Sequence, residues 1–209
     1  MLALSDCHLY GIVDLGYVAA GDVPSMTRKL LAGGVDILQL RAKKLGKREI
    51  ERLAREMLPI TRDAGVPLVI NDHLDVAAEV GSEGVHIGQD DGSVAAARAL
   101  VGPSCFVGKS THSLAQAVAA QAEGADYIGF GPLYATGTKP DYVPIGLGDI
   151  AAVHRSVTVP IFCIGGVNQV RLPEVLAAGA RRVVIVSAFL LAENVSESVR
   201  AVKPLLPGD

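Results

Sequence analysis

The sequence has few of the residues that mark disulfide-rich or nucleic-acid-binding proteins. It holds three cysteines among 209 residues, and they lie far apart: Cys7, Cys105 and Cys163. Because no CxxC spacing occurs, we expect buried thiols and not a metal or redox motif. Tryptophan is absent, and aromatic residues make up only 4% of the chain. The net charge of −3 argues against a nucleic-acid partner.

Long apolar runs are also missing. The longest, residues 183–192, is interrupted by Ser187 and is too short to cross a bilayer. Residues 1–6 contain no basic residue and no cleavage-site pattern, so we expect no signal peptide. These absences predict a cytoplasmic protein with no membrane partner.

The chain does contain a weak internal repeat and enough apolar residues for a sizeable core. Half of its residues are hydrophobic, and no linker divides it, so we expect one domain over residues 1–209. Glycine at the end of a helical pattern, followed by a short apolar run, recurs at residues 32–40, 122–130 and 177–186, and more loosely at 79–87. Glycine commonly ends helices because it adopts the left-handed conformation easily.

These runs are apolar without alternation, which is typical of parallel strands buried on both faces. We expect strands near residues 8–13, 36–41, 67–71, 84–88, 105–109, 126–130, 160–164 and 182–186. Helical patterns occupy residues 24–33, 47–63, 73–80, 93–101, 113–123, 147–155, 168–178 and 188–201. Eight strand–helix units predict an α/β fold, a single (β/α)8 TIM barrel. An open doubly wound sheet is the alternative, although residues 13–22 lack its G-x-G-x-x-G turn.

Polar residues gather after the predicted strands, where barrels of this kind carry their chemistry. The candidate site residues are Gln39, Arg41, Lys43, Asn71, Asp72, Asp91, Ser110, Thr136, Thr138, Lys139, Gly166, Val186 and Ser187. Asp72 and Asp91 follow neighbouring strands and could hold Mg²⁺, which usually takes one or two carboxylates together with substrate phosphate. Helix capping is the plainer explanation for Asp72. Three cations, Arg41, Lys43 and Lys139, would neutralise a diphosphate and stabilise it as a leaving group.

The last two strand ends suggest a second anion site. Gly165 and Gly166 would let backbone amides approach a phosphate, and Ser187 would begin the final helix. A tight turn alone is the alternative for the two glycines. The long polar loop 130–145 would serve as a lid, or is an insertion without a function. Of the histidines, His112 could face the ligand, whereas His86 is expected to be an interior residue.

The motifs Q-L-R-x-K, N-D, G-Q-D-D, S-T-H, G-P-x-x-x-T-x-T-K, G-G-V and V-S, in this order, resemble the thiamine phosphate synthase family. The resemblance extends from Gln39 to Ser187. It implies that a pyrimidine diphosphate and a thiazole phosphate are joined with Mg²⁺, and that diphosphate leaves first to give a pyrimidine methylene cation. Gln39, Arg41, Lys43, Asn71, Ser110 and Lys139 would bind the pyrimidine diphosphate, and Asp72 and Asp91 would bind the metal. Thr136, Thr138, Gly166, Val186 and Ser187 would bind the thiazole phosphate.

The chain departs from the family pattern in two places: Ala135 stands where proline is common, and Lys109 where an apolar residue is usual. Three other functions stay open. A thiazole tautomerase of the same superfamily would use a histidine near His112, and a sugar-phosphate epimerase would need paired acid–base residues. A non-catalytic barrel would only bind the phosphate ligand. A homo-oligomer is compatible with each of them.

Overall fold

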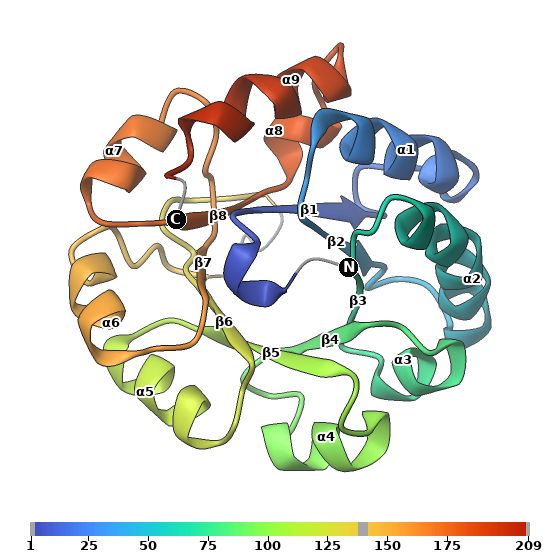
Figure 1. Ribbon diagram of the computed structural model, residues 1–209, viewed down its shortest axis with the longest axis horizontal. Coiled ribbons are helices and arrows are strands. Elements are labelled where there is room, and N and C mark those ends of the chain that lie inside the picture. Colours follow the sequence, from blue (N-terminus) through green and yellow to red (C-terminus); the bar gives the residue numbers. More distant parts are fainter. Residues whose placement is uncertain (1–2, 138–141, 208–209) are drawn as a thin grey trace.

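The computed structural model describes residues 3–137 and 142–207. In these residues eight parallel strands follow one another around a closed barrel, and the eighth pairs with the first. The helices form a ring outside the strands (Figure 1). The closed α/β barrel confirms the predicted fold and excludes the open sheet.

The strands and helices alternate along the chain. The strands are β1 (Leu9–Asp14), β2 (Ile37–Arg41), β3 (Leu68–Asn71), β4 (Gly84–Ile87), β5 (Phe106–Thr111), β6 (Tyr127–Phe130), β7 (Ile161–Cys163) and β8 (Arg182–Ile185). The α-helices are α1 (Val23–Gly33), α2 (Lys47–Asp63), α3 (Leu74–Val80), α4 (Val94–Val101), α5 (Leu114–Ala122), α6 (Ile150–Ser156), α7 (Leu172–Ala177), α8 (Ser187–Leu190) and α9 (Val195–Val202). Three short 3-10 helices are η1 (Leu4–Asp6), η2 (Ala20–Asp22) and η3 (Lys203–Leu205).

The strands are buried on both faces, as their unbroken apolar runs indicate. All six residues of β1 are buried, and so are all four of β6. The helices bury only one side: in α2 the buried residues recur at helical spacing, from Ile50 through Leu53 and Met57 to Thr61. The barrel interior and the strand–helix layer therefore form one continuous core.

The prediction of a single helix over residues 188–201 is wrong. The structure holds two helices there, and α8 has only four residues. The break falls at residues 191–194, where Leu191 is 67% exposed. Asn194 then begins α9, because its side chain accepts a hydrogen bond from the Glu197 amide at 3.2 Å. A capping asparagine thus ends the pattern that apolar spacing alone would continue.

Several other element boundaries differ from the prediction, among them the start of α7 and the end of β5. The helix expected over 168–178 begins at Leu172, because the Asn168 side chain accepts a hydrogen bond from the Arg171 amide at 2.9 Å and forms a turn before it. Strand β5 continues to Thr111, two residues beyond the predicted end. As a result, Ser110 lies within a strand.

Acidic side chains connect neighbouring strands at the N-terminal end of the barrel. Asp36, just before β2, accepts hydrogen bonds from the His8 and Leu9 amides at 2.9 and 2.8 Å and pairs with Lys203. Glu83 and Asp126 repeat this arrangement before β4 and β6. Glu83 accepts from the Leu68 amide and pairs with Arg62, and Asp126 accepts from the Val107 amide and pairs with Arg98. The helix η1 lies across this end (Figure 1).

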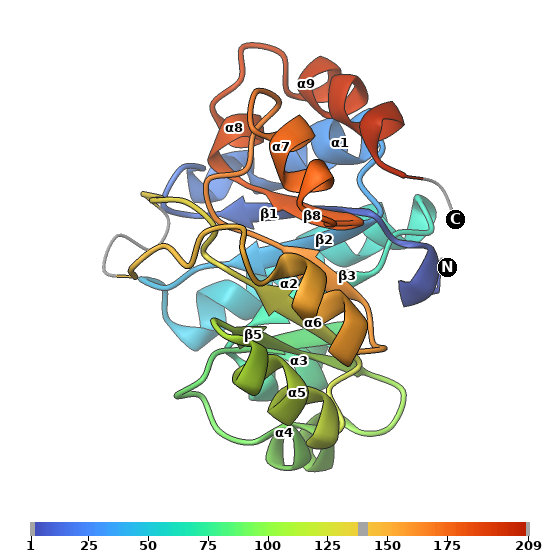
Figure 2. The same cartoon turned by 90° about the vertical axis from the view of Figure 1, so that its left-hand side faces the viewer.

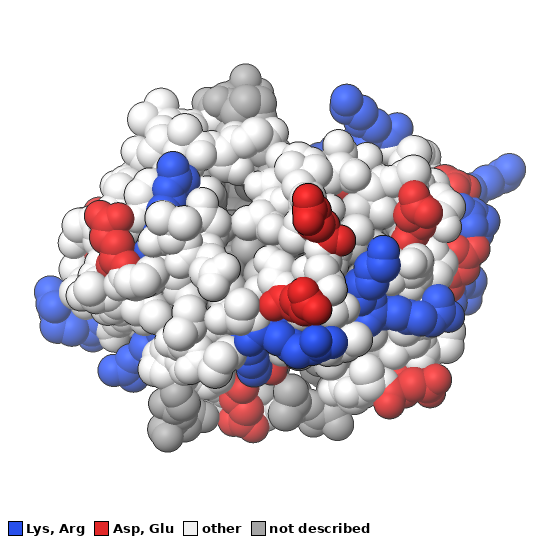
Figure 3. All heavy atoms as spheres, turned by 90° about the horizontal axis from the view of Figure 1, so that it is seen from above, with Lys and Arg blue, Asp and Glu red and all other residues white. Residues whose placement is uncertain are grey.

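Several expectations from composition can be compared with the structure. All three cysteines are buried and unbonded to one another, as predicted. Among the described residues, no helix is long and apolar enough to span a membrane. On the face seen in Figure 3, acidic and basic side chains are interspersed, in keeping with the small net charge.

Candidate active site

One cavity of about 690 Å³ opens where the strands end. The loops that follow the strands lie at the opposite end of the barrel from η1 (Figure 2), and the residues that line the cavity belong to these loops and to the strands. The predicted site residues that line it are Gln39, Arg41, Lys43, Asn71, Asp72, Asp91, Ser110, Thr136, Gly166, Val186 and Ser187. Thr138 and Lys139 lie outside the described residues. Side chains from the ends of β2, β3, β5 and β8 and from the loops after β4, β6 and β7 therefore share one space.

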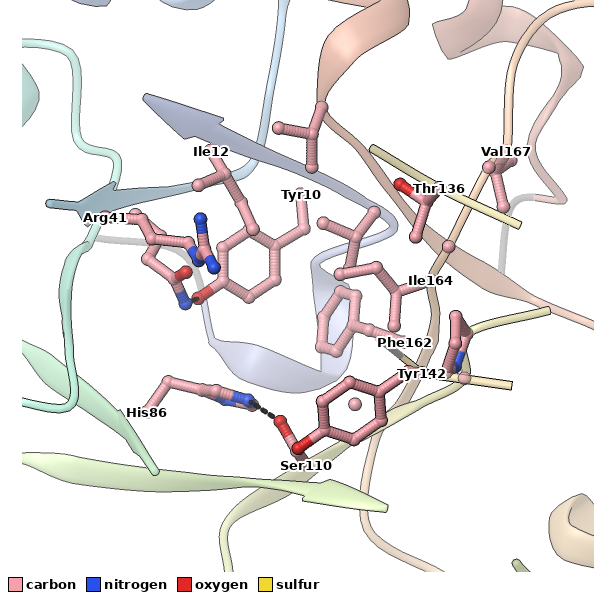
Figure 4. A pocket seen from close by; sticks show the side chains of 18 of the residues that line it. Tyr10, Ile12, Arg41, His86, Ser110, Thr136, Tyr142, Phe162, Ile164 and Val167 are labelled. Atoms are coloured by element: carbon pink, nitrogen blue, oxygen red, sulfur yellow. Dashed lines mark hydrogen bonds between the residues drawn. The ribbon is translucent and has the colours of Figure 1, made fainter. Parts of the chain in front are cut away.

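Aromatic rings form the floor of this cavity. Tyr10 and Phe162 meet edge to face with centroids 5.4 Å apart, and Tyr127 and Phe162 do the same at 5.6 Å. All three rings are almost completely buried and line the cavity. Figure 4 shows Tyr10 and Phe162 side by side there. The Gln39 amide donates a hydrogen bond to the Tyr10 hydroxyl at 2.8 Å. The floor is thus made of largely apolar rings, and the tyrosines among them carry hydroxyl groups.

His86 links the floor to the wall. Its Nε2 lies 2.9 Å from Ser110 Oγ (Figure 4), and its Nδ1 lies 3.0 Å from the Tyr127 hydroxyl. The sequence predicted an interior residue, which is incomplete, because His86 also lines the cavity. A ring bonded at both nitrogens is fixed in orientation, so it holds the Ser110 hydroxyl in one position.

Arg41 is held by Asp14, which is not among the predicted site residues. Its Nη1 lies 2.6 Å from Asp14 Oδ2, and both side chains are nearly buried. Asp14 also accepts a hydrogen bond from the Gly16 amide at 2.8 Å, which fixes the carboxylate. A buried charge is costly without a partner, so the ion pair with Asp14 offsets the cost of placing Arg41 in the cavity wall.

A cluster of one lysine and two aspartates is formed by the segments that follow β2, β3 and β4. Lys43 forms an ion pair with Asp72, whose backbone has a positive φ of 64°. Asp91 accepts a hydrogen bond from the Gly88 amide at 2.7 Å and lies close enough to Asp72 to interact with it. Burial raises the pKa of Asp72 above its ordinary value; Lys43 opposes the increase and Asp91 adds to it. The cluster carries more negative than positive charge.

These two carboxylates have the chemistry that a hard divalent cation requires. Among the residues that the structure describes, no group of three or more His, Cys, Asp or Glu side chains is arranged to hold a metal. Mg²⁺ does not need such a cage, because it binds through one or two carboxylates and completes its shell with water and phosphate. Asp72 and Asp91 therefore fit magnesium better than a structural zinc.

The opposite side of the cavity is built from the loops after β6 and β7. Thr136 and Val167 lie on this side, away from Arg41 and His86 (Figure 4). Gly165 has a φ of 101°, and a Cβ there would meet the Pro132 Cα at 2.4 Å. Only glycine allows the two loops to approach this closely. The amide-rich turn predicted at Gly165–Gly166 is therefore packed directly against the loop that carries Thr136.

Two residues of uncertain role from the sequence have clear positions. The His112 ring lies 5.0 Å from the Tyr142 ring, and its Nδ1 contacts the Gly131 carbonyl, so His112 lines the cavity. Lys109 points the other way: it is buried beneath α5, with Nζ 2.7 Å from Glu123. Lys109 therefore does not contribute to the cavity.

Several cavity residues were missed in the sequence. They are Tyr10, Asp14, Tyr127, Phe162 and Arg171, of which Asp14 supports the site from behind Arg41 and the others line the cavity. Asp14 could have been found, because it ends the first strand just as the selected residues end theirs. The three aromatic residues lie inside apolar runs, where nothing in the local pattern separates inward from outward side chains.

Comparison with known proteins agrees with this geometry. A family model described as thiamine monophosphate synthase matches residues 9–189. A thiamine-phosphate synthase of Chloroflexus aurantiacus is 41% identical over 202 residues, covering 96% of this chain and 93% of that protein. A thiamine-phosphate synthase of Methanocella arvoryzae is 39% identical over 199 residues, covering 95% and 94%.

A solved structure extends the comparison to three dimensions. The thiamine phosphate pyrophosphorylase from Pyrococcus furiosus superposes with a TM-score of 0.87 at 29% identity, covering 96% of this chain and 95% of that one. The fold, the cavity at the strand ends and the sequence likeness over nearly the whole chain lead to the same result. The chain belongs to the thiamine monophosphate synthase family and is a transferase of thiamine biosynthesis that forms thiamine phosphate and releases diphosphate.

Proposed function

We propose that the cavity joins a pyrimidine-methyl diphosphate to a thiazole phosphate, with Mg²⁺ held at Asp72 and Asp91. The observation that carries this proposal is the Lys43–Asp72–Asp91 cluster beside Arg41 in one cavity. Asp72 and Asp91 share one lysine, so they can bind a further cation, and Arg41 and Lys43 line the same space and can contact an anion bound to that cation. A magnesium diphosphate supplies both.

The pyrimidine diphosphate would occupy the side of the cavity formed by the ends of β2, β3 and β5. Arg41, Lys43 and Lys139 would surround the diphosphate, and Asp14 would keep Arg41 in place. Gln39, Asn71 and Ser110 would bind the polar edge of the pyrimidine above the aromatic floor. His86 would keep the Ser110 hydroxyl oriented through their 2.9 Å contact.

The reaction would begin when the bond between the methylene carbon and the diphosphate oxygen breaks and the electron pair leaves with the diphosphate. Fixed positive charges stabilise that leaving group, which is electrostatic catalysis. Bound Mg²⁺ would add charge neutralisation at the diphosphate. The thiazole nitrogen would then attack the methylene carbon. The buried rings of Tyr10, Tyr127 and Phe162 would keep water from below the reacting carbon.

The thiazole phosphate would bind on the opposite side, at Thr136, Thr138, Gly166, Val186 and Ser187. Backbone amides and hydroxyl groups are suitable donors for a phosphate. We also propose that the whole chain acts as one barrel domain. The location in the cell and the oligomeric state stay predictions from the sequence.

A coupling assay tests this proposal. Purified protein is mixed with both substrates and Mg²⁺, and thiamine phosphate and diphosphate are measured. We expect equal amounts of both products, and no turnover once a chelator removes the metal. Full activity in chelator would contradict the role of Asp72 and Asp91. A protein that only interconverts thiazole tautomers would contradict the proposed reaction.

A further inference from the structure

Arg171 is a cation of the cavity that none of the predicted motifs contains. Among the described residues, the lysine and arginine side chains that line the cavity are Arg41, Lys43 and Arg171. The first two come from the end of β2, and each is paired with an aspartate. Arg171 comes from the start of α7, on the side of the cavity that holds Gly166.

Among the described residues, the contacts of the Arg171 guanidinium hold it in place without neutralising it. Its Nη1 donates a hydrogen bond to the Gly166 carbonyl at 2.8 Å. The guanidinium carbon lies 4.4 Å from the centre of the Tyr134 ring, in a cation–π arrangement. The Tyr134 hydroxyl in turn donates to Glu174 at 3.0 Å, which fixes the ring. The two groups that position the guanidinium are therefore neutral, and its positive charge stays available to an anion in the cavity.

A positive charge would strengthen the binding of a phosphate on this side. Gly166 and Ser187 offer only neutral donors, and α8, which begins at Ser187, has four residues and sums few aligned peptide dipoles. A phosphate monoester carries up to two negative charges near neutral pH. Arginine suits it well, because the planar guanidinium can donate two parallel hydrogen bonds to phosphate oxygens.

We propose that Arg171 binds the phosphate of the thiazole substrate and sets the preference of this enzyme for the phosphorylated thiazole over the free alcohol. The proposal rests on the proposed function of the cavity and assigns it a specificity residue. Arg171 would rotate little to reach the ligand, because Tyr134 and the Gly166 carbonyl already hold its head group at the cavity wall. A pre-positioned donor loses little side-chain entropy on binding.

The test compares Arg171→Gln with the wild type and with Arg155→Gln, an exposed arginine of α6 outside the cavity. In Arg171→Gln we expect KM for the thiazole phosphate to rise about 10- to 100-fold, as the loss of a charged hydrogen bond predicts. KM for the pyrimidine diphosphate, and kcat/KM with the unphosphorylated thiazole alcohol, should stay within about twofold of the wild type. The control variant should match the wild type in all three.

Two results would overturn the proposal. One is an unchanged KM for the thiazole phosphate in Arg171→Gln. The other is an equal loss with the phosphate and the alcohol, which would mean that Arg171 only supports the loop at Tyr134. If Arg171→Gln does not fold, Arg171→Lys replaces it in the test, because lysine keeps the charge but cannot form bidentate hydrogen bonds. Arg171→Lys should raise KM several-fold for the thiazole phosphate alone. An unchanged KM in this variant would overturn the proposal. A wild-type protein without any coupling activity would instead contradict the proposed function itself.

Discussion

The two ends of the barrel use the same residue types in opposite ways. At the N-terminal end, Asp36, Glu83 and Asp126 each accept a hydrogen bond from a backbone amide of the preceding strand and pair with a basic side chain. At the C-terminal end, Asp72 and Asp91 lie beside each other and share the cavity with Lys43. Carboxylates whose partners are all supplied by the protein stabilise the fold, whereas carboxylates that repel each other leave a requirement that a ligand can meet.

The raised pKa of Asp72 is the electrostatic sign of this difference. Burial and the neighbouring Asp91 both disfavour its charged form, and Lys43 only partly compensates. The folded state therefore carries an electrostatic cost at this end. A bound divalent cation would remove that cost, so the arrangement favours ligand binding over stability without ligand.

The largest expected effect concerns activity at the C-terminal end. Asp72→Asn keeps the size of the side chain but removes one of the two charges proposed to bind magnesium. We expect kcat/KM for the coupling reaction to fall about 100- to 1000-fold, which is typical when one group that stabilises developing charge is lost. The free energy of unfolding should change by less than about 1 kcal/mol, because the variant loses both an ion pair and a repulsion.

Asp36→Asn is the matched control at the other end. It changes the same chemical group but lies far from the cavity, so kcat/KM should match the wild type well below the unfolding temperature. A variant Asp72→Asn with nearly normal activity would contradict the proposed difference between the two ends. So would a loss of activity in Asp36→Asn at a temperature where it is folded.

The second effect concerns stability at the N-terminal end. Asp36 is almost buried. It accepts hydrogen bonds from two backbone amides, one just before β1 and one at the start of β1, and it forms an ion pair with Lys203. We expect Asp36→Asn to lower the free energy of unfolding by about 2–4 kcal/mol, measured in urea. A side-chain amide cannot replace a carboxylate that accepts hydrogen bonds from three donors. The exposed Asp63, substituted in the same way, should cost less than about 0.5 kcal/mol. Equal losses for the two variants would contradict this prediction.

The comparison also explains how much the sequence could predict. The repeated pattern of glycine, apolar run and polar end was enough to predict the barrel. It was also enough to identify eleven candidate residues that line the cavity. These residues were found because they follow strands, and the strand ends of a closed parallel barrel meet at one edge. Position along the chain was sufficient there.

Whether a strand side chain points into the barrel or outward was not predictable from the sequence. Lys109 and Ser110 are neighbours on β5, yet Lys109 points outward to Glu123 and Ser110 points inward to His86. Both faces of the strand are buried, so no alternation of polar and apolar residues reveals which face is which. The same ambiguity concealed the inward aromatic rings of Tyr10 and Tyr127. Arg171 was missed because only the path of the loop after β7 brings it to the cavity.

A histidine at the N-terminal end of the barrel is an exception to the well-satisfied polar groups there, and it should have a small effect on stability. His154 lies in the last turn of α6, and its buried Nε2 has no hydrogen-bond partner among the described residues. Burial lowers the pKa of His154 to about 4, and the nearby Arg181 and Arg182 contribute to the shift. In contrast to the aspartates at this end, His154 has a polar atom that the fold does not satisfy.

The sign of its pH effect follows from linkage. Between pH 6.5 and about 4, His154 binds a proton in the unfolded chain but not in the folded one. The unfolded state therefore gains stability as the pH falls, and the wild type loses free energy of unfolding below pH 6.5. His154→Phe removes this titration and the unsatisfied nitrogen, and keeps a ring of similar shape. We expect the wild type to lose about 1 kcal/mol more than this variant between pH 7 and pH 5, after allowance for solvent screening. Urea unfolding of both proteins at the two pH values measures the difference, and parallel losses would show that His154 is protonated as readily in the folded barrel as in the unfolded chain.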